Sequence, residues 1–576
     1  MTKTAEQRRK TRLDAEVGTI RKPWQDRIRV ALVYPNLYGV GMASLGFQTA
    51  YRLLNAMAHV VCERAFLPDP EDENAPLVSL ESGRRLRDFH CLAFSLSFEL
   101  DYANVLTILQ KTELPLPTAQ RNISLPLVMA GGVSVLLNPE PLAQFFDLFL
   151  IGEGENLIEP FFNRFDPYQD RKQFLLTAAK DLPGVYVPAF YTVGYKADGA
   201  LTNFHPLKNV PATVKRVYAR RIDRFATDSV VVTPHASFED AHLIEVSRGC
   251  PHGCRFCAAG YVYRPPRFRP LHQLQRSLET AGRLSKKIGL LGAAVSDLPH
   301  LETLCRAGSQ NALQLSFSSL RADALTPGLV AALKSGRLKT ATIAPEAGSE
   351  RLRRVINKGL NETAILDAAE LLVANGIPNL KLYFMIGLPT ETQEDVAALA
   401  DLVQKIKQRF LGASRVRGRM GRITISLNCF VPKPWTPFQW TVMDRVPTLN
   451  QKIRQIKKNL RPVANVRVQA DSPRNAMIQA ILSRGDRKTS DLLTLAHRHH
   501  GNWPQSLKQA SINPAFYTHR ERPREELLPW AFIDHGLAPA YLWNEYQRAI
   551  HGKTTPRCPA DPENCRICGV CDGIAP

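Results

Sequence analysis

His242-Leu-Ile-Glu-Val246 is a strand-like run with three aliphatic residues, and after three further residues the chain reads Cys250-Pro-His-Gly-Cys254-Arg-Phe-Cys257. The run predicts a buried strand, with the cysteines directly after its carboxyl end. Three thiols spaced C-x3-C-x2-C can bind three irons of a 4Fe-4S cluster, whereas four thiolates usually saturate one. The loop therefore predicts a cluster with one iron free for another ligand.

A structural zinc ion is the alternative for this loop, and it would need a fourth protein ligand. His252 lies inside the loop and is the available side chain. Its two-residue spacing to both Cys250 and Cys254 would strain a tetrahedral centre. The loop therefore favours iron over zinc.

Five more strand-like segments follow, and amphipathic helical segments separate them. These segments are 288–291, 313–317, 340–343, 380–386 and 423–431. Six β/α units predict a partial (β/α)6 barrel of the TIM type, in which active sites lie at the carboxyl ends of the strands. The cysteine loop follows the first strand at that end.

The N-terminal part has its own alternation of strands and helices, with strands expected at 27–33, 91–96, 126–130 and 146–151. Such alternation predicts a doubly wound, Rossmann-like α/β domain with a parallel sheet covered on both faces. Two glycine-rich turns, Gly131-Gly132 and Gly152-Glu-Gly-Glu155, follow strands, where open α/β sheets place ligand loops.

At 576 residues the chain is too long for one core of ordinary size. We expect an N-terminal extension (1–26), the Rossmann-type domain (27–165), a connecting region (166–239), the barrel (240–440) and a mainly helical C-terminal region with a cysteine-rich tail (441–576). No long apolar run or hydrophobic leader occurs, so the sequence predicts a cytoplasmic protein without a membrane span.

The tail carries four cysteines spaced C-x6-C-x2-C-x2-C, namely Cys558, Cys565, Cys568 and Cys571. An iron-sulfur cluster and a structural zinc both suit this ligand set, and the overlapping C-x2-C-x2-C spacing favours iron-sulfur. The remaining four cysteines stand alone in apolar surroundings and are expected to be buried: Cys62, Cys91, Cys305 and Cys429.

The net charge is +21, and the stretch 403–470 alone contributes +14, because it has fifteen lysines and arginines and one acid, Asp444. Such a block attracts a polyanion such as RNA, or it is a solvated basic surface. Part of it is a predicted helix with one apolar face: Leu449, Ile453, Ile456 and Leu460. The opposite face is basic: Lys452, Arg454, Lys457 and Arg461.

The cysteine loop resembles the signature of the radical S-adenosylmethionine (SAM) superfamily, which has an aromatic residue before its last cysteine, here Phe256. The resemblance implies that the open iron chelates the amino and carboxyl groups of SAM. An electron then breaks the S–C5′ bond, giving methionine and a 5′-deoxyadenosyl radical. A flavodoxin- or ferredoxin-type electron donor is implied as well.

Further segments match that superfamily and imply cofactor contacts. Glu346, in Ala344-Pro-Glu-Ala-Gly-Ser349, would contact the ribose or amino group of SAM, or else pair with Arg351 or Arg353 as an ordinary loop carboxylate. Ser349 is a plausible N-cap for the helix that follows. Gly387 and Pro389 lie in an element similar to the one that lines adenine.

Two more positions follow from the same resemblance. The usual Gly-Gly-Glu element after the second strand is absent, and Ser296 with Asp297 takes its place. Ser316 and Ser318 on the third strand would face the ribose, or they are polar residues packed in the barrel. The sequence assigns no catalytic residue.

The chain as a whole resembles a radical SAM family with an N-terminal domain of the cobalamin-binding type, through Tyr34-Pro-Asn36, Asn138-Pro-Glu-Pro141 and the terminal cysteines. Cobalamin domains of the base-off type carry a histidine after the first strand. The loop 36–41 has none, and the only histidines from residue 27 to residue 165 are His59 and His90. Bound cobalamin would lack this ligand.

The resulting prediction is a radical SAM enzyme that abstracts hydrogen, or transfers a methyl group if it holds cobalamin. RNA is one candidate substrate, and a peptide or an anionic metabolite is another. A non-catalytic iron-sulfur protein that binds RNA or transfers electrons is the rival interpretation. That rival would have no use for the segments around Glu346 and Gly387.

Overall fold

The computed structural model describes residues 3–73, 75–318, 320–335, 338–416, 418, 420–559 and 565–571. The chain divides into two compact units. Unit 1 consists of Met1–Ala241, Ile481–Tyr517 and Glu525–Gly536, and unit 2 of His242–Ala480, Thr518–Arg524 and Leu537–Pro576. The boundary at 241 and 242 lies close to the predicted start of the barrel at 240. The five-segment division of the sequence stays a prediction.

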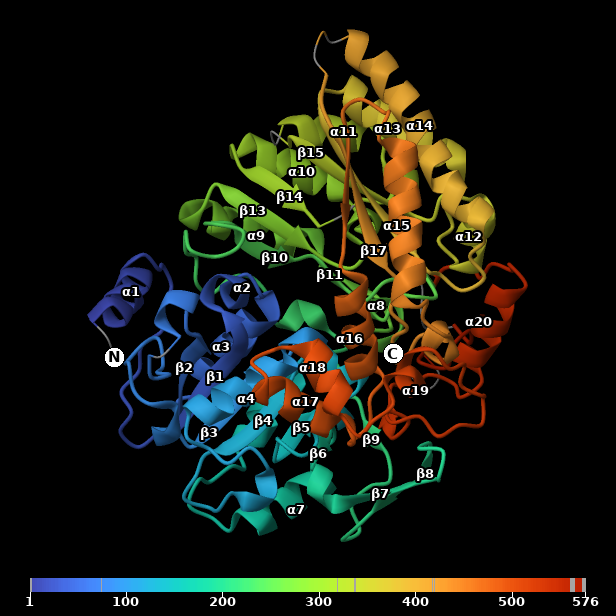
Figure 1. The fold of residues 1–576 in the computed structure, drawn as a ribbon. Coiled ribbons are helices and arrows are strands. Elements are labelled where there is room, and N and C mark those ends of the chain that lie inside the picture. Colours follow the sequence, from blue (N-terminus) through green and yellow to red (C-terminus); the bar gives the residue numbers. More distant parts are fainter. Residues whose placement is uncertain are drawn as a thin grey trace. The chain divides into compact units, whose positions relative to one another are not determined.

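Unit 1 contains a six-stranded sheet in the order β2-β1-β3-β4-β5-β6 (Figure 1). Its strands are β1 (Ile28–Leu37), β2 (Val60–Leu67), β3 (Cys91–Ser95), β4 (Leu127–Gly131), β5 (Leu148–Leu150) and β6 (Val185–Tyr186). All neighbours pair in parallel except β5 and β6. The order reverses between β1 and β3, and right-handed crossovers then place the connecting helices on opposite faces. The α/β class with a parallel sheet is confirmed.

The strand β2 is absent from the sequence-based prediction, because two charged residues interrupt its apolar run. Arg64, in the middle of β2, is fully buried. Its guanidinium contacts Glu16 at 2.6 Å and Glu81 at 2.7 Å. A buried charge is tolerated when it is paired in this way. Both partners come from outside the strand, so the local pattern does not reveal them.

Smaller elements complete unit 1. They are the hairpin strands β7 (Tyr191–Tyr195) and β8 (Leu201–Pro206) and the parallel pair β9 (Val214–Lys215) and β19 (Ile533–Asp534). The helices are α1 (Lys3–Asp14), α2 (Tyr38–Met42), α3 (Leu45–Ala56), α4 (Tyr102–Lys111), α5 (Val133–Leu137), α6 (Ile158–Phe162), α7 (Arg171–Asp181), α17 (Thr489–Arg498) and α18 (Trp503–Gln509). Along the chain, α16 (Pro473–Ser483) and α19 (Pro514–Thr518) cross from one unit to the other.

Unit 2 contains seven parallel strands in two sheets, β10-β13-β14 and β15-β16-β17-β18, and a single bridge joins Leu320 to Ile343 of β15. The strands are β10 (His242–Glu245), β13 (Lys287–Leu291), β14 (Gln314–Phe317), β15 (Thr340–Glu346), β16 (Asn379–Ile386), β17 (Ile423–Cys429) and β18 (Val466–Ala470). The six predicted strands are all present, and β18 is additional. Since the strands form two sheets, the barrel itself stays a prediction.

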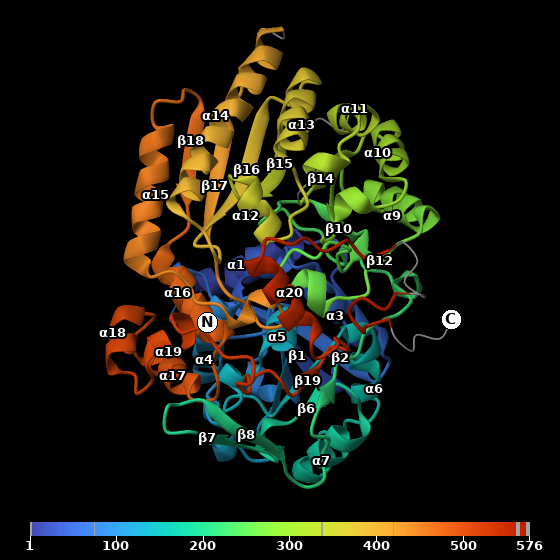
Figure 2. The same cartoon turned by 90° about the vertical axis from the view of Figure 1, so that its right-hand side faces the viewer.

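One face of these sheets is covered by helices. Burial alternates along β16, where Leu380, Leu382 and Phe384 are buried, while Lys381 and Tyr383 are half-buried. Figure 2 shows helices along the outer side of the strands. The helices of unit 2 are α8 (Ala259–Val262), α9 (Leu271–Leu284), α10 (Leu301–Gln310), α11 (Pro327–Ser335), α12 (Glu350–Val355), α13 (Glu362–Ala374), α14 (Gln393–Val416), α15 (Val446–Leu460) and α20 (Tyr541–Ile550). The opposite, partly exposed face is left for polar groups.

Two further predictions from the sequence agree with the structure. The four lone cysteines are all buried, as predicted. The region after residue 440 is mainly helical, as predicted, apart from β18 and β19. Among the described residues, no helix combines the length and the apolar character that crossing a membrane requires.

Candidate functional site

The candidate site begins at the loop that follows β10 and the short strand β11 (Ser247–Arg248), which pairs with β12 (Arg267–Phe268). Cys254 is buried, and Cys250 and Cys257 are half-buried. Burial, followed by the charges of Cys254 and Cys257, raises the pKa of Cys250 to about 12. The three thiols therefore lie close enough to repel one another when ionised. A bound metal supplies the positive charge that keeps such thiols deprotonated. The donor set fits a 4Fe-4S cluster.

The three thiols lie near one another, but they do not point toward one common centre. Within the described residues, no three histidine, cysteine or acidic side chains form a group that is ready to hold a metal ion. Each cysteine reaches its other staggered positions by rotation about one χ1 bond. Metal binding at this loop stays a prediction, which the ligand type and the spacing support.

His252, the alternative fourth ligand for zinc, is engaged elsewhere. Its Nε2 lies 3.0 Å from both carboxylate oxygens of Asp297, which follows β13. This contact favours a three-thiol loop over a zinc site that includes His252. It also brings the segment predicted to replace the Gly-Gly-Glu element directly against the cysteine loop.

Beside Cys254 lies a charged group from three other segments, in which Lys358 is buried and Glu346 and Arg321 are half-buried. Lys358 Nζ contacts Glu346 Oε1 at 3.2 Å, and Arg321 donates to the carbonyl of Lys358 at 3.3 Å. Burial acts to lower the pKa of Lys358, but the charges of Glu346 and then Cys254 outweigh it and leave this pKa raised. Lys358 and Arg321 in turn oppose the rise that burial causes in the pKa of Cys254. Two cations and a carboxylate thus face the central thiol of the loop.

Glu346 has an unusual backbone. Its φ is +68°, and the pairing register between β15 and β16 shifts between Ile343 and Glu346. A non-glycine residue in the left-handed region costs of order 1–3 kcal/mol, and such residues concentrate at functional sites. In this conformation, at the carboxyl end of β15, the Glu346 carboxylate contacts Lys358.

The alternative pairing of Glu346 with Arg351 or Arg353 is wrong. Arg351 pairs with Asp395, and Arg353 donates to the carbonyls of Ala347 and Gly348 at 2.9 Å. Both arginines therefore hold the turn after Glu346 and leave its carboxylate to Lys358.

Asp395 connects this turn to the start of α14. Its carboxylate accepts hydrogen bonds from the Ser349 hydroxyl, from Arg351 and, at 2.9 Å, from the backbone N–H of Thr392. Ser349 also caps α12, as predicted, by accepting from the N–H of Leu352 at 3.1 Å. Burial acts to raise the pKa of Asp395, but the hydrogen bonds from Arg351 and Ser349 outweigh it and lower this pKa.

Asp395→Asn is expected to destabilise unit 2 by about 1–2 kcal/mol at neutral pH, because charge-assisted hydrogen bonds are lost and Arg351 is half-exposed. The folded pKa of Asp395 lies below its unfolded value, so its stabilisation is present above about pH 4 and fades as the pH falls through the folded pKa. Urea unfolding between about pH 7 and about pH 3 measures this. Asp401→Asn, at an exposed position of α14, is the control. A difference that grows on acidification would contradict the assignment.

Ser296 lies next to the same group, since its hydroxyl accepts from the N–H of Arg321 at 2.9 Å. Ser316 is exposed, and its hydroxyl donates to the carbonyl of Ile288 at 3.2 Å within the sheet. Phe256 and Pro389 are half-buried. The structure thus brings Ser296 and Glu346 to the cysteine loop. Cofactor contacts by all these residues stay predictions.

Gly387, at the end of β16, belongs to a second cluster of interacting residues. Its φ is +78°, and a Cβ there would lie 2.9 Å from Leu449 Cδ2, so the turn requires glycine. The N–H of Gly387 donates to the carboxylate of Glu391. Lys452 Nζ contacts both Glu391 and Asp444 at 2.7 Å. The placement of Lys452 on an outer basic face is therefore wrong, because it is buried in this ion pair.

Sequence reasoning missed the functional side chains that come from other segments. Lys358 and Arg321 stand in no motif, and Arg255 stands within the cysteine motif without a predicted role. The contacts of all three become evident only when the chain is folded. The charge of Arg255 gives no indication that the side chain is buried. Arg321 and Lys358 stand at no characteristic spacing from the cysteines, so the sequence gives no signal for them.

The four tail cysteines lie together in unit 2. Cys565, Cys568 and Cys571 are buried, and Cys558 is half-buried. Burial, followed by the charges of the other three tail thiols, raises the pKa of Cys571 to about 11. All four thiols therefore share one region, although the metal they take stays a prediction.

The carboxyl edge of the sheet in unit 1 is where a cobalamin would bind. Asn36 donates to Asp101 there at 2.8 Å, and burial raises the pKa of Asp101 to about 6. His59 and His90 immediately precede β2 and β3 and so lie at the opposite edge. Within the described part of 27–165, no histidine is placed to bind cobalt after β1, so these residues do not fit a base-off cobalamin.

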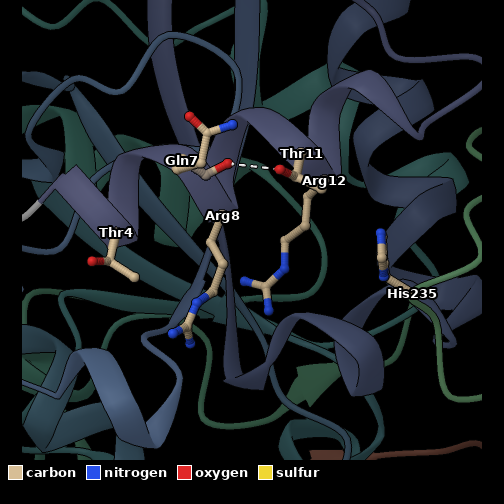
Figure 3. Close-up of a pocket in the computed structure, with 6 residues that line it drawn as sticks. All are labelled: Thr4, Gln7, Arg8, Thr11, Arg12 and His235. Carbon is tan, nitrogen blue, oxygen red and sulfur yellow. Dashed lines mark hydrogen bonds between the residues drawn. The ribbon is translucent and has the colours of Figure 1, made fainter.

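A surface pocket of about 690 Å³ also lies in unit 1, lined by Arg8, Arg12 and His235 together with three polar residues of α1 (Figure 3). Arg12 contacts Asp69 at 2.8 Å, and Arg8 contacts Glu71 at 2.8 Å. Since carboxylates already neutralise both guanidinium groups, the pocket offers little attraction to an anion.

Comparison with known proteins gives two family matches. The family described as radical SAM proteins, N-terminal, matches residues 46–188, and the radical SAM superfamily matches residues 244–403. An uncharacterised protein of Methanocaldococcus jannaschii is 33% identical over 470 residues, which cover 81% of this chain and 90% of the relative.

Two further proteins are more distant. An uncharacterised methyltransferase of Pyrococcus horikoshii is 23% identical over 358 residues, which cover 58% of this chain and 70% of the relative. The solved structure of the cobalamin-dependent SAM radical enzyme OxsB aligns with a TM-score of 0.45 and 15% identity. That alignment covers 68% of this chain and only 56% of OxsB.

Proposed function

The chain is an enzyme of the radical SAM superfamily, and on this premise we propose that it generates a 5′-deoxyadenosyl radical at the Cys250–Cys257 loop to abstract hydrogen from an anionic substrate, with RNA as the favoured class. When bound, the 4Fe-4S cluster supplies the electron that cleaves SAM. A one-electron donor of the flavodoxin or ferredoxin type delivers that electron. The free thiols fit a reducing compartment, so we place the enzyme in the cytoplasm.

One observation carries the proposal: Glu346, Lys358, Arg321 and Ser296 converge beside Cys254. The two cations would offset the negative charge of thiolate ligands and attract the carboxylate of SAM. Glu346 would accept from its amino group or ribose. Since Lys358 is buried and Glu346 is half-buried, water screens these interactions less than it would on an open surface.

The basic stretch supports RNA less strongly than its charge of +14 suggests. Lys405 pairs with Glu362, Arg409 with Glu370, and Lys452 with Glu391, so acids from outside the stretch neutralise part of it. Exposed basic side chains remain on α15 and directly after its end: Arg454, Lys457, Lys458 and Arg461. These remain available to a polyanion.

The test is anaerobic reconstitution with iron and sulfide, followed by SAM and a strong reductant. We expect 5′-deoxyadenosine and methionine in equal amounts, and a higher rate when RNA is added at low salt. The stimulation should fall steeply as salt rises, because phosphate contacts release counterions. Absence of 5′-deoxyadenosine from fully reconstituted protein would overturn the proposal. If small anions raise the rate as much as RNA does, the substrate class is an anionic metabolite instead of RNA.

Methyl transfer is the second candidate, and the similarity to an uncharacterised methyltransferase favours it. It would require cobalamin bound without a histidine from the loop after β1. Co-expression with cobalamin-uptake proteins, followed by an absorbance spectrum, decides between the two. A spectrum without cobalamin bands would remove the methyl-transfer route.

A further inference from the structure

The C-terminal tail is hydrogen-bonded to the cysteine loop within unit 2. The N–H of Cys558 donates to the carbonyl of Pro251 at 2.8 Å. Asn357 joins the two segments a second time, because its side chain donates to the carbonyls of Gly253 and Thr555 at 3.1 Å and accepts from the N–H of Thr555 at 2.9 Å. The first tail cysteine therefore lies beside the first cysteines of the loop.

This contact limits how far apart the two sets of thiols can be. On standard bond lengths, the hydrogen bond from Cys558 keeps its sulfur within about 16 Å of the sulfur of Cys250. The backbone connection is direct, and both segments belong to the same compact unit. Groups bound by the two sets would be neighbours.

The surroundings of the tail thiols also suit a metal group of net negative charge. Arg264 is buried and donates to the Tyr541 hydroxyl at 3.0 Å. Burial acts to lower the pKa of Arg264, but the charges of Tyr541, Cys558 and Cys568 are among those that outweigh it and raise this pKa. A buried guanidinium offsets part of the charge of four thiolates. Three of the four thiols are buried, which shields a bound group from water and oxygen.

We propose that the tail cysteines hold a second iron-sulfur cluster, through which electrons enter the SAM-binding loop. The proposal rests on the proposed function above. One electron is transferred: the external flavodoxin- or ferredoxin-type donor is oxidised by one electron. SAM is reduced by that electron, and its S–C5′ bond breaks. The tail neither gains nor loses an atom, and no proton moves.

The experiment compares the full-length protein with its Cys568→Ala/Cys571→Ala variant after reconstitution. Iron should fall from about eight to about four atoms per chain, with the loss of one electron paramagnetic resonance signal from the reduced protein. SAM cleavage driven by reduced flavodoxin should fall at least about tenfold, while cleavage driven by dithionite, a small reductant, should change much less. Cys305→Ala, which removes a lone buried thiol, should alter neither iron nor rate.

Asn357→Gly provides a second variant that leaves all seven cysteines in place. Asn357 has a φ of +53°, and glycine keeps that backbone while removing the bridging amide. Iron should stay near eight atoms per chain, whereas the flavodoxin-driven rate should fall. The folding of each variant is checked by its dithionite-driven cleavage.

Three outcomes would overturn the proposal. They are zinc in place of iron at the tail, an iron content that the double variant leaves unchanged, and an equal loss of the flavodoxin- and dithionite-driven rates. Failure of the proposed function is distinguishable. In that case no reductant gives 5′-deoxyadenosine from the wild type, while the iron count still tests the second cluster.

Discussion

Cys254→Ala is expected to abolish SAM cleavage, with 5′-deoxyadenosine at least about a hundredfold below the wild type. Cys254 is the buried central thiol of the loop, and Lys358 and Arg321 face it. Without it the loop offers two thiols, which cannot hold a cluster through three irons. The measurements are iron and sulfide per chain and anaerobic product formation.

Cys305→Ala is the matched control, because Cys305 is also a buried thiol of unit 2 but lies outside both cysteine clusters. It should retain the iron of the loop and the wild-type rate. Retention of more than about a tenth of the activity by Cys254→Ala would show that the radical does not arise at this loop.

Arg255→Ala is expected to destabilise unit 2 by about 3–5 kcal/mol. Arg255 lies inside the cysteine loop with no exposed surface. Its guanidinium donates to Glu545, to the carbonyls of Arg354 and Val355 in α12, and to Lys553 and Thr555 in the tail. The alanine variant leaves the buried Glu545 with only the more distant Arg548, at 3.7 Å, as a cation, and the loss of a buried partner is what makes breaking such a pair costly.

Urea unfolding of the full-length protein, followed with the iron content after reconstitution, measures this effect. Arg354→Ala, at an exposed position of α12, is the control and should change stability by no more than about 0.5 kcal/mol. Arg255→Lys should recover part of the loss, because lysine restores the charge but not the five-donor fork. A loss below about 1 kcal/mol for Arg255→Ala would show that the loop does not depend on this anchor.

Glu346 and Arg255 differ in how much of their roles the sequence predicts. Glu346 was predicted from a segment at the end of a strand, and the structure places it there, beside the loop. The sequence predicts no role for Arg255, because a charged residue between two cysteines gives no sign of being buried. Its partners lie about a hundred and about three hundred residues away.

The sequence by itself determined the strand before Cys250, the α/β alternation on both sides of it, and the spacing of seven thiols, because these depend on local periodicity and on ligand chemistry. Only the tertiary structure decided which charges face those thiols and that the tail reaches the loop. Lys358, Arg321, Asn357 and Arg255 act through contacts between distant segments. Burial and charge pairing set their roles, and neither is a property of a residue's neighbours in the chain.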